Sequence, residues 1–197
     1  MKTGASVVGH VRMCAALVAI VAGASAFPAS PALPASSAAT QSAAPPTPEV
    51  RAFDAFIRTS APICLRAPAA HCIKVGWRFA DRNRDNRLSA AELDAVRTAV
   101  KAWSAWPGNG MSRSQRRSVL LGLMVAEAIG AARLIGLYDE DADGHLSRAE
   151  LMRDIRLDRR PLGRILQDPR AVDWDRLRAR LGALAPALGT LAPTPTE

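Results

Sequence analysis

Two twelve-residue segments of the chain share one pattern of oxygen-bearing side chains, and this repetition constrains the fold more than any other feature. The segments are residues 81–92 and 139–150. Both carry Asp, Asn or Ser at positions 1, 3, 5 and 9, and both have Glu at position 12: Asp81, Asn83, Asp85, Ser89 and Glu92, then Asp139, Asp141, Asp143, Ser147 and Glu150. A hard cation such as calcium takes about six to eight oxygen ligands, which alternate side chains of a tight loop can supply.

Positions 6 and 8 of each segment support the same interpretation. Position 6 must turn sharply, usually with a positive φ, and Gly144 meets this requirement without steric cost. Asn86 stands there in the first segment, and Asn adopts the left-handed region more readily than most residues. Leu88 and Leu146 both occupy position 8. These leucines would let the two loops pair backbone to backbone, but 46 residues separate Glu92 from Asp139, and whether the loops pair face to face stays open.

With these residues in place, the chain resembles the EF-hand family over residues 77–103 and 123–158. The resemblance implies a helix, a calcium loop and a helix in each of two units, with Ca²⁺ as the bound ion. It also implies that position 7 contributes only its backbone carbonyl. The ligands carried over are Asp81, Asn83, Asp85, Arg87 (carbonyl), Ser89 and Glu92, and Asp139, Asp141, Asp143, His145 (carbonyl), Ser147 and Glu150.

A simpler explanation exists for the end of each segment. Ser-x-x-Glu is also the capping box that starts a helix, and both Ser89/Glu92 and Ser147/Glu150 fit it. A capping box does not explain the three carboxylates that precede Ser147, because they would repel one another without a cation between them. It also does not explain why the whole pattern occurs twice.

The N-terminus has the features of an export signal. Lys2 and Arg12 precede an apolar run over residues 13–21, and small residues follow up to Ala26. This order predicts a signal peptide over residues 1–26, cleaved after Ala26, and a periplasmic or secreted protein. Residues 27–48 are almost entirely Ala, Pro, Ser and Thr, which predicts a disordered tether.

The rest of the chain predicts an all-α fold, in which an EF-hand pair and additional flanking helices form one domain over residues 49–184. Apolar periodicity and capping signals place the helices. The expected helices are 49–59, 73–80, 90–105, a long helix from the Ser112 cap through Tyr138, 148–157 and 172–184. Residues 185–197 are expected to form a flexible tail.

One segment, residues 119–137, is apolar on nearly every side and could be mistaken for a membrane span. Glu127 and Arg133 would then lie near the middle of the bilayer, and an Arg there costs about 2.5–3.5 kcal/mol. The segment also leads directly into the second acidic loop. We therefore expect a buried core helix, bent near Gly122 or Gly130, and no transmembrane span in the mature chain.

Two cysteines, Cys64 and Cys72, follow the predicted signal. In an oxidising compartment such a pair predicts a disulfide. The alternative is a metal or catalytic site formed with His71, but the sequence offers neither a fourth ligand nor a partnered base for it.

These features predict a calcium-binding protein with a structural or low-affinity sensing role, and not an enzyme. The chain has 26 basic against 18 acidic residues, a net charge of +8. An alternative function uses nine arginines between Arg153 and Arg180, which could bind anionic lipid or polysaccharide beside a C-terminal amphipathic helix. We expect no nucleic-acid partner, and any protein partner is left open.

Overall fold

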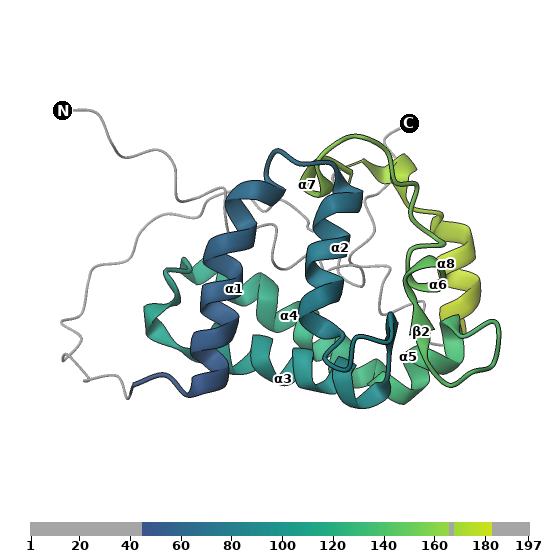
Figure 1. The fold of residues 1–197 in the computed structure, drawn as a ribbon. Helices are drawn as coiled ribbons and strands as arrows, with labels where there is room; N and C mark the ends of the chain where they lie inside the picture. Colours follow the sequence, from purple (N-terminus) through teal and green to yellow (C-terminus); the bar gives the residue numbers. More distant parts are fainter. Residues whose placement is uncertain (1–44, 166–167, 183–197) are drawn as a thin grey trace.

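The computed structural model describes residues 45–165 and 168–182 (Figure 1). The predicted signal peptide, most of the tether, Leu184 and the C-terminal tail lie outside these residues. The described part is mostly helical, as expected, with one short sheet. Its elements are α1 Pro48–Cys64, α2 Ala69–Ala80, β1 Arg87–Leu88, α3 Ala90–Ala105, η2 Pro107–Asn109, α4 Arg113–Ile129, α5 Ala131–Tyr138, β2 Leu146–Ser147, α6 Arg148–Leu151, α7 Leu162–Ile165, η3 Pro169–Ala171 and α8 Trp174–Leu181.

Helices α1 and α2 stand side by side over α3, with α4 passing behind them (Figure 1). The stacked rings of Phe56 and Phe79, with centroids 4.2 Å apart, join α1 to α2. Phe53 and Trp103 meet edge to face between α1 and α3, with centroids 5.5 Å apart. These aromatic contacts fix the first unit against α1, and this helix therefore belongs to the core.

The first two helices are longer than the sequence predicts. Helix α1 continues past Thr59 to Cys64, and α2 begins at Ala69 and not at Ile73. Pro62 lies in the last turns of α1, where the carbonyl it leaves unbonded belongs to the exposed Arg58. The two cysteines are therefore helical residues.

The long apolar helix breaks at Gly130, one of the two positions expected to bend. Gly130 has φ 76° and ψ 151°, so α4 ends there and α5 starts at an angle of 73° to it. The prediction that residues 119–137 form a buried helix is wrong in part, because Leu120, Leu121 and Met124 of α4 are exposed. Within the described residues no single helix has the length and apolar composition of a membrane span, whereas α4 and α5 together meet those criteria as a bent pair.

The helix expected over residues 148–157 is wrong in length. Helix α6 ends at Leu151, because the chain then turns so that Ile155 forms a β-bridge with Val172. The Arg156 N–H donates to the Ala171 carbonyl at 2.7 Å, which completes this crossing. Helix α8 is likewise shorter than residues 172–184 and buries Leu177 and Leu181 in the same core as Trp77 and Tyr138.

Candidate metal centre

Each acidic segment begins directly after a helix and ends in the first turn of another. Asp81 follows α2 and Asp139 follows α5, and their N–H groups donate to the carbonyls of Trp77 and Ile135, both at 2.8 Å. At the other end, Ser89 and Ser147 are the N-caps of α3 and α6. Both segments therefore connect two helices through a loop with the same start and end.

The two loops also share one backbone conformation. Position 6 is left-handed in both, with φ 66° at Asn86 and 78° at Gly144, as predicted. Position 4 is left-handed as well, with φ 64° at Arg84 and 59° at Ala142, which the sequence did not predict. Neither Arg nor Ala favours this region, so the left-handed conformation at position 4 costs free energy in both loops.

The loops are joined to each other by the short sheet. Strands β1 and β2 are antiparallel, with Leu88 opposite Leu146 and Arg87 opposite Ser147. Both leucines are buried in the core cluster that contains Trp77 and Tyr138. The leucines at position 8 therefore pair across the sheet, which settles the question that the sequence left open and places the two loops side by side.

The second loop gathers three carboxylates. Ligand-type oxygens of Asp139, Asp141 and Asp143 lie within 4.8 Å of one another. Backbone N–H groups hold them in place: Gly144 donates to Asp139 at 2.8 Å and His145 donates to Asp143 at 2.8 Å. The arrangement places concentrated negative charge inside a loop of fixed shape, which is what a divalent cation requires.

The first loop is less acidic and more internally bonded. The Asn83 amide donates to Asp85 at 2.8 Å, and the pKa of Asp85 is lowered by N–H donation from Arg87 and by this amide. Asp81 is 6 % exposed, and its Oδ2 accepts from the Asn86 N–H at 2.9 Å. Its Oδ1 is buried and has no hydrogen-bond partner among the described residues. Such an oxygen is costly unless something else satisfies it.

The glutamates at position 12 close both loops. Glu92 accepts from the Arg82 N–H at 2.9 Å, and Glu150 accepts from the Glu140 N–H at 2.8 Å. Both also complete capping boxes with the N-cap serine, so the simpler explanation of Ser-x-x-Glu is present too. A capping box alone does not join position 12 to position 2, so these glutamates do more than start a helix.

These hydrogen bonds control the charge of the two buried glutamates. Burial would raise the pKa of Glu150, but N–H donors from Glu140 and Ser147 and the Ser147 hydroxyl lower it to about 2. Burial acts in the same direction on Glu92, and donors from Ser89 and Arg82 outweigh it, so its pKa is also lowered. Both side chains are therefore anionic at neutral pH.

Position 7 departs from the expectation that only its carbonyl matters. The Arg87 guanidinium reaches across the sheet and forms an ion pair with Asp143 of the second loop. The His145 ring stays within its own loop, with Nδ1 3.0 Å from the Asp143 carbonyl. The sequence could not indicate the Arg87 contact, because its partner lies in the other unit.

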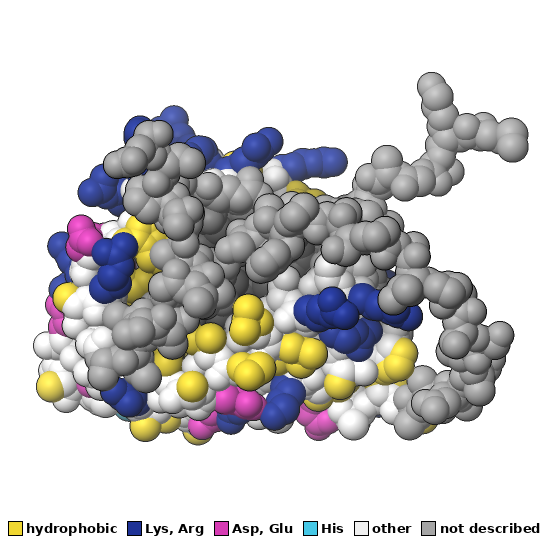
Figure 2. Space-filling view, turned by 180° about the vertical axis from the view of Figure 1, so that it is seen from behind, with side chains coloured by type: hydrophobic (Ala, Val, Ile, Leu, Met, Phe, Trp, Pro, Cys, Tyr) yellow, Lys and Arg dark blue, Asp and Glu magenta, His cyan; other side chains and the backbone are white. Residues whose placement is uncertain are grey.

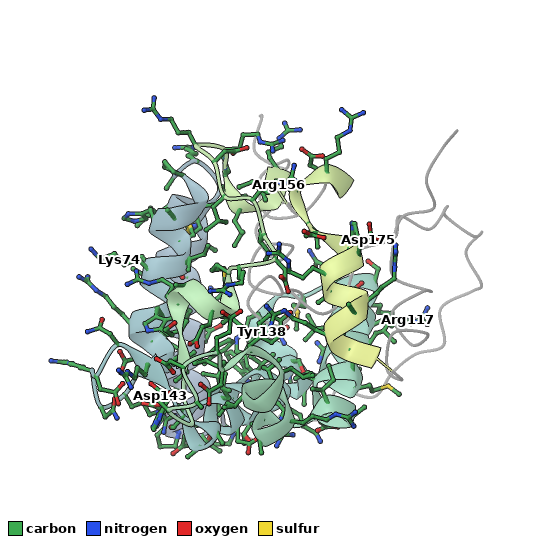
Figure 3. All side chains as sticks on the ribbon, turned by 90° about the vertical axis from the view of Figure 1, so that its right-hand side faces the viewer. Lys74, Arg117, Tyr138, Asp143, Arg156 and Asp175 are labelled. Carbon is green, nitrogen blue, oxygen red and sulfur yellow. A yellow bond between two sulfur atoms is a disulfide. The ribbon has the colours of Figure 1, made fainter. Side chains whose placement is uncertain are left out.

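A second arginine contact, also missed from the sequence, fixes helix α8 to the start of the second loop. Arg180 donates to the Leu137 carbonyl at 2.8 Å and to Glu140 at 3.0 Å, and its guanidinium lies over the Tyr138 ring, 5.0 Å from the centroid. It is also 3.4 Å from the carboxylate of Asp154, which is 3 % exposed. Tyr138 lies at the centre of the molecule and Asp143 at its edge (Figure 3).

Cys64 and Cys72 form a disulfide with a Cα–Cα distance of 5.4 Å, as predicted. The bond joins the last residue of α1 to α2. Disulfide sulfurs are not thiolates, so this pair does not offer the metal ligands or nucleophile that the alternative site with His71 would need.

Comparison with protein-family models, with curated proteins and with solved structures found no match to this chain.

Proposed function

We propose that the chain binds two calcium ions in paired loops of the EF-hand type. Side-chain oxygens of positions 1, 3, 5, 9 and 12 would supply most ligands, and the carbonyls of Arg87 and His145 would complete the two sets. The three aspartates of the second loop, with oxygens within 4.8 Å of one another, are the observation that carries the proposal. Backbone N–H donors and Arg87 offset part of their mutual repulsion, and a divalent cation between them would neutralise the rest.

The first loop is included because of Asp81. Its buried Oδ1 lacks a hydrogen-bond partner among the described residues, and it stands at the position equivalent to Asp139. An ion in the first loop would satisfy this oxygen. The basic residues around the loop favour a lower affinity here than in the second loop, because they repel a cation.

The role proposed for the ions is structural. The loops hold β1 and β2 together and connect four helices, so an ion in each would stabilise the junction of the two units. A site with few acidic ligands and neighbouring arginines suits an environment rich in calcium, where affinities of about 10⁻⁴–10⁻³ M suffice.

A low-affinity sensor is the second candidate, and a cavity favours it. About 170 Å³ of mainly apolar space lies among α1, α2, α3 and the α4–α5 corner, lined in part by Phe56, Phe79, Leu93, Val96 and Leu134. If calcium changes the angle between helices, the exposure of this cavity should change with it. Fluorescence of an apolar dye should then rise when calcium is added, whereas a purely structural ion leaves the dye signal unchanged.

Isothermal titration calorimetry of the full chain with calcium and magnesium tests the binding itself. We expect two calcium events, of which Glu150→Gln removes one and Glu92→Gln removes the other. Asp175→Asn is the matched control, because Asp175 is an exposed carboxylate of α8 far from either loop in sequence. Heat from neither ion, or equal loss in the control, would contradict the proposal.

A further inference from the structure

Helix α4 is apolar on two sides, and only one of them is covered. Val119, Leu123 and Ile129 are buried against the rest of the domain. On the opposite side Leu120, Leu121 and Met124 are 44 %, 47 % and 65 % exposed. Single exposed apolar residues are ordinary, but three large ones within two turns of one helix form a contiguous patch of the kind that marks an interaction surface.

Two arginines extend this patch towards the start of the helix. Arg113 and Arg117 are exposed, and their spacing from Leu120, Leu121 and Met124 places them on the same side of α4. Within residues 45–165 and 168–182 neither side chain has an ion-pair partner. Basic residues in the first turns of a helix also oppose its dipole, so helix stability does not account for them.

On the face drawn in Figure 2, hydrophobic side chains lie beside a group of Lys and Arg side chains. Arg117 lies on the side of the molecule away from Asp143 and the second loop (Figure 3). The patch is therefore separate from the candidate metal centre.

We propose that this face of α4 binds the surface of an anionic phospholipid membrane. Leu120, Leu121 and Met124 would enter the boundary between headgroups and acyl chains, while Arg113 and Arg117 contact lipid phosphates. The net charge of +8 adds attraction at longer range. This inference goes beyond calcium binding and does not depend on it.

A second copy of the chain fits the face less well. The acidic residue of α4, Glu127, already pairs with Lys101 at 2.7 Å and Arg97 at 3.1 Å. A facing α4 would therefore offer no free carboxylate to Arg113 or Arg117, and their charges would meet no partner in the interface. Lipid phosphates supply that charge.

The arginines near the C-terminus are less available for binding anionic lipid than the sequence suggested. Five of them are in ion pairs with nearby carboxylates: Arg153, Arg160, Arg176, Arg178 and Arg180. Arg156 and Arg159 of the same run are exposed, and neither forms an ion pair with another described residue. They provide a control that removes the same charge from another surface.

The test is co-sedimentation of the full chain with vesicles of phosphatidylcholine alone or mixed with phosphatidylglycerol, at one calcium concentration throughout. Binding should require the anionic lipid. Arg113→Gln/Arg117→Gln should lower the apparent affinity about ten- to thirtyfold, at roughly 1 kcal/mol for each basic residue near the surface. Leu121→Ser/Met124→Ser should also weaken binding, and Arg156→Gln/Arg159→Gln should change it little.

Hydrogen exchange shows whether α4 itself contacts the vesicles. This matters because the apolar segment at residues 13–21 of the full chain could bind lipid without slowing exchange in α4. Vesicles should slow exchange in peptides from α4, and the Arg113→Gln/Arg117→Gln variant should lose this effect. Equal binding by both double arginine variants, or no vesicle-dependent change in α4, would overturn the proposal. So would slowing that appears without vesicles and grows with protein concentration, because that result identifies a second copy as the occupant.

Discussion

The guanidinium of Arg87 in the first loop is paired with the carboxylate of Asp143 in the second. The contact crosses the two-stranded sheet and uses one of the three clustered aspartates. An ion entering the second loop must therefore compete with a side chain supplied by the first. This links the properties of the two proposed sites directly.

Removing that competitor should strengthen calcium binding by the second loop. We expect Arg87→Gln to raise the affinity about two- to fivefold, because an ion pair this exposed contributes up to about 1 kcal/mol. Calorimetric titration measures the change. Arg82→Gln removes an equal charge from the same loop, and Arg82 forms no ion pair with another residue that the structure describes. A similar gain in that variant would indicate general electrostatics and not the Arg87 contact.

Gly144 should be sensitive to substitution for its backbone alone. A Cβ there meets no atom within 4 Å, so Gly144→Ala adds no clash, but φ is 78° and the left-handed conformation costs about 1–2 kcal/mol. We expect the free energy of unfolding to fall by that amount. Gly136→Ala is the control, since Gly136 lies in α5 with equally open space and should be stabilised by about 0.5–1 kcal/mol.

Stability should fall in acid because of Glu150. The folded pKa of about 2 lies below the ordinary value of 4.5, so the unfolded chain takes up the proton first as the pH falls. The contribution of Glu150 is therefore complete above pH 4.5 and is lost between pH 4.5 and about 2. In calcium-free thermal melts, the difference between the wild type and Glu150→Gln should shrink over this range. A difference that stays constant would contradict the assignment.

Arg180 should be essential to the position of α8. Arg180→Gln would leave Asp154 buried at 3 % exposure with its main cationic partner gone, which destabilises by about 3–5 kcal/mol. Adding Asp154→Asn should recover part of the loss, because the uncompensated charge is then removed. Denaturant unfolding of the two variants measures both effects. No recovery in the double variant would assign the loss to packing against Tyr138.

Burial and Asp154 also affect Tyr138. Burial, together with the neighbouring carboxylate of Asp154, raises the pKa of this phenol above its ordinary value. Arg180 opposes this pKa shift but does not cancel it, and because the net shift is upward the phenol is neutral at neutral pH. Tyr138 is therefore a neutral core residue next to the second loop.

How far the sequence predicts the fold depends on how local the signals are. Helix α3 begins and ends at the predicted residues, because Ser89 and Glu92 form its capping box and Pro107 follows its end. Helix α6 is shorter than predicted, because its end is set by the bridge between Ile155 and Val172. That bridge is a tertiary contact and leaves no trace in the helical periodicity.

In the candidate site, too, features set within one loop were predictable from the sequence, whereas contacts between the two units were not. The positive φ at Asn86 and Gly144 follows from their position within a twelve-residue pattern, which allowed the pairing of Leu88 with Leu146 but did not establish it. The contacts of Arg87 with Asp143 and of Arg180 with Glu140 join residues from different units. Spacing cannot indicate such contacts, because many exposed arginines in this chain are equally plausible partners.

The Leu88–Leu146 pair has a consequence for how the protein is made. The chain emerges from the ribosome from its N-terminus, so the first unit is complete while its leucine still lacks the strand that covers it. Closing the contact requires the whole intervening helical segment, including the corner at Gly130, to be synthesised and folded back. This contact between the two halves therefore forms only after the later strand has been synthesised.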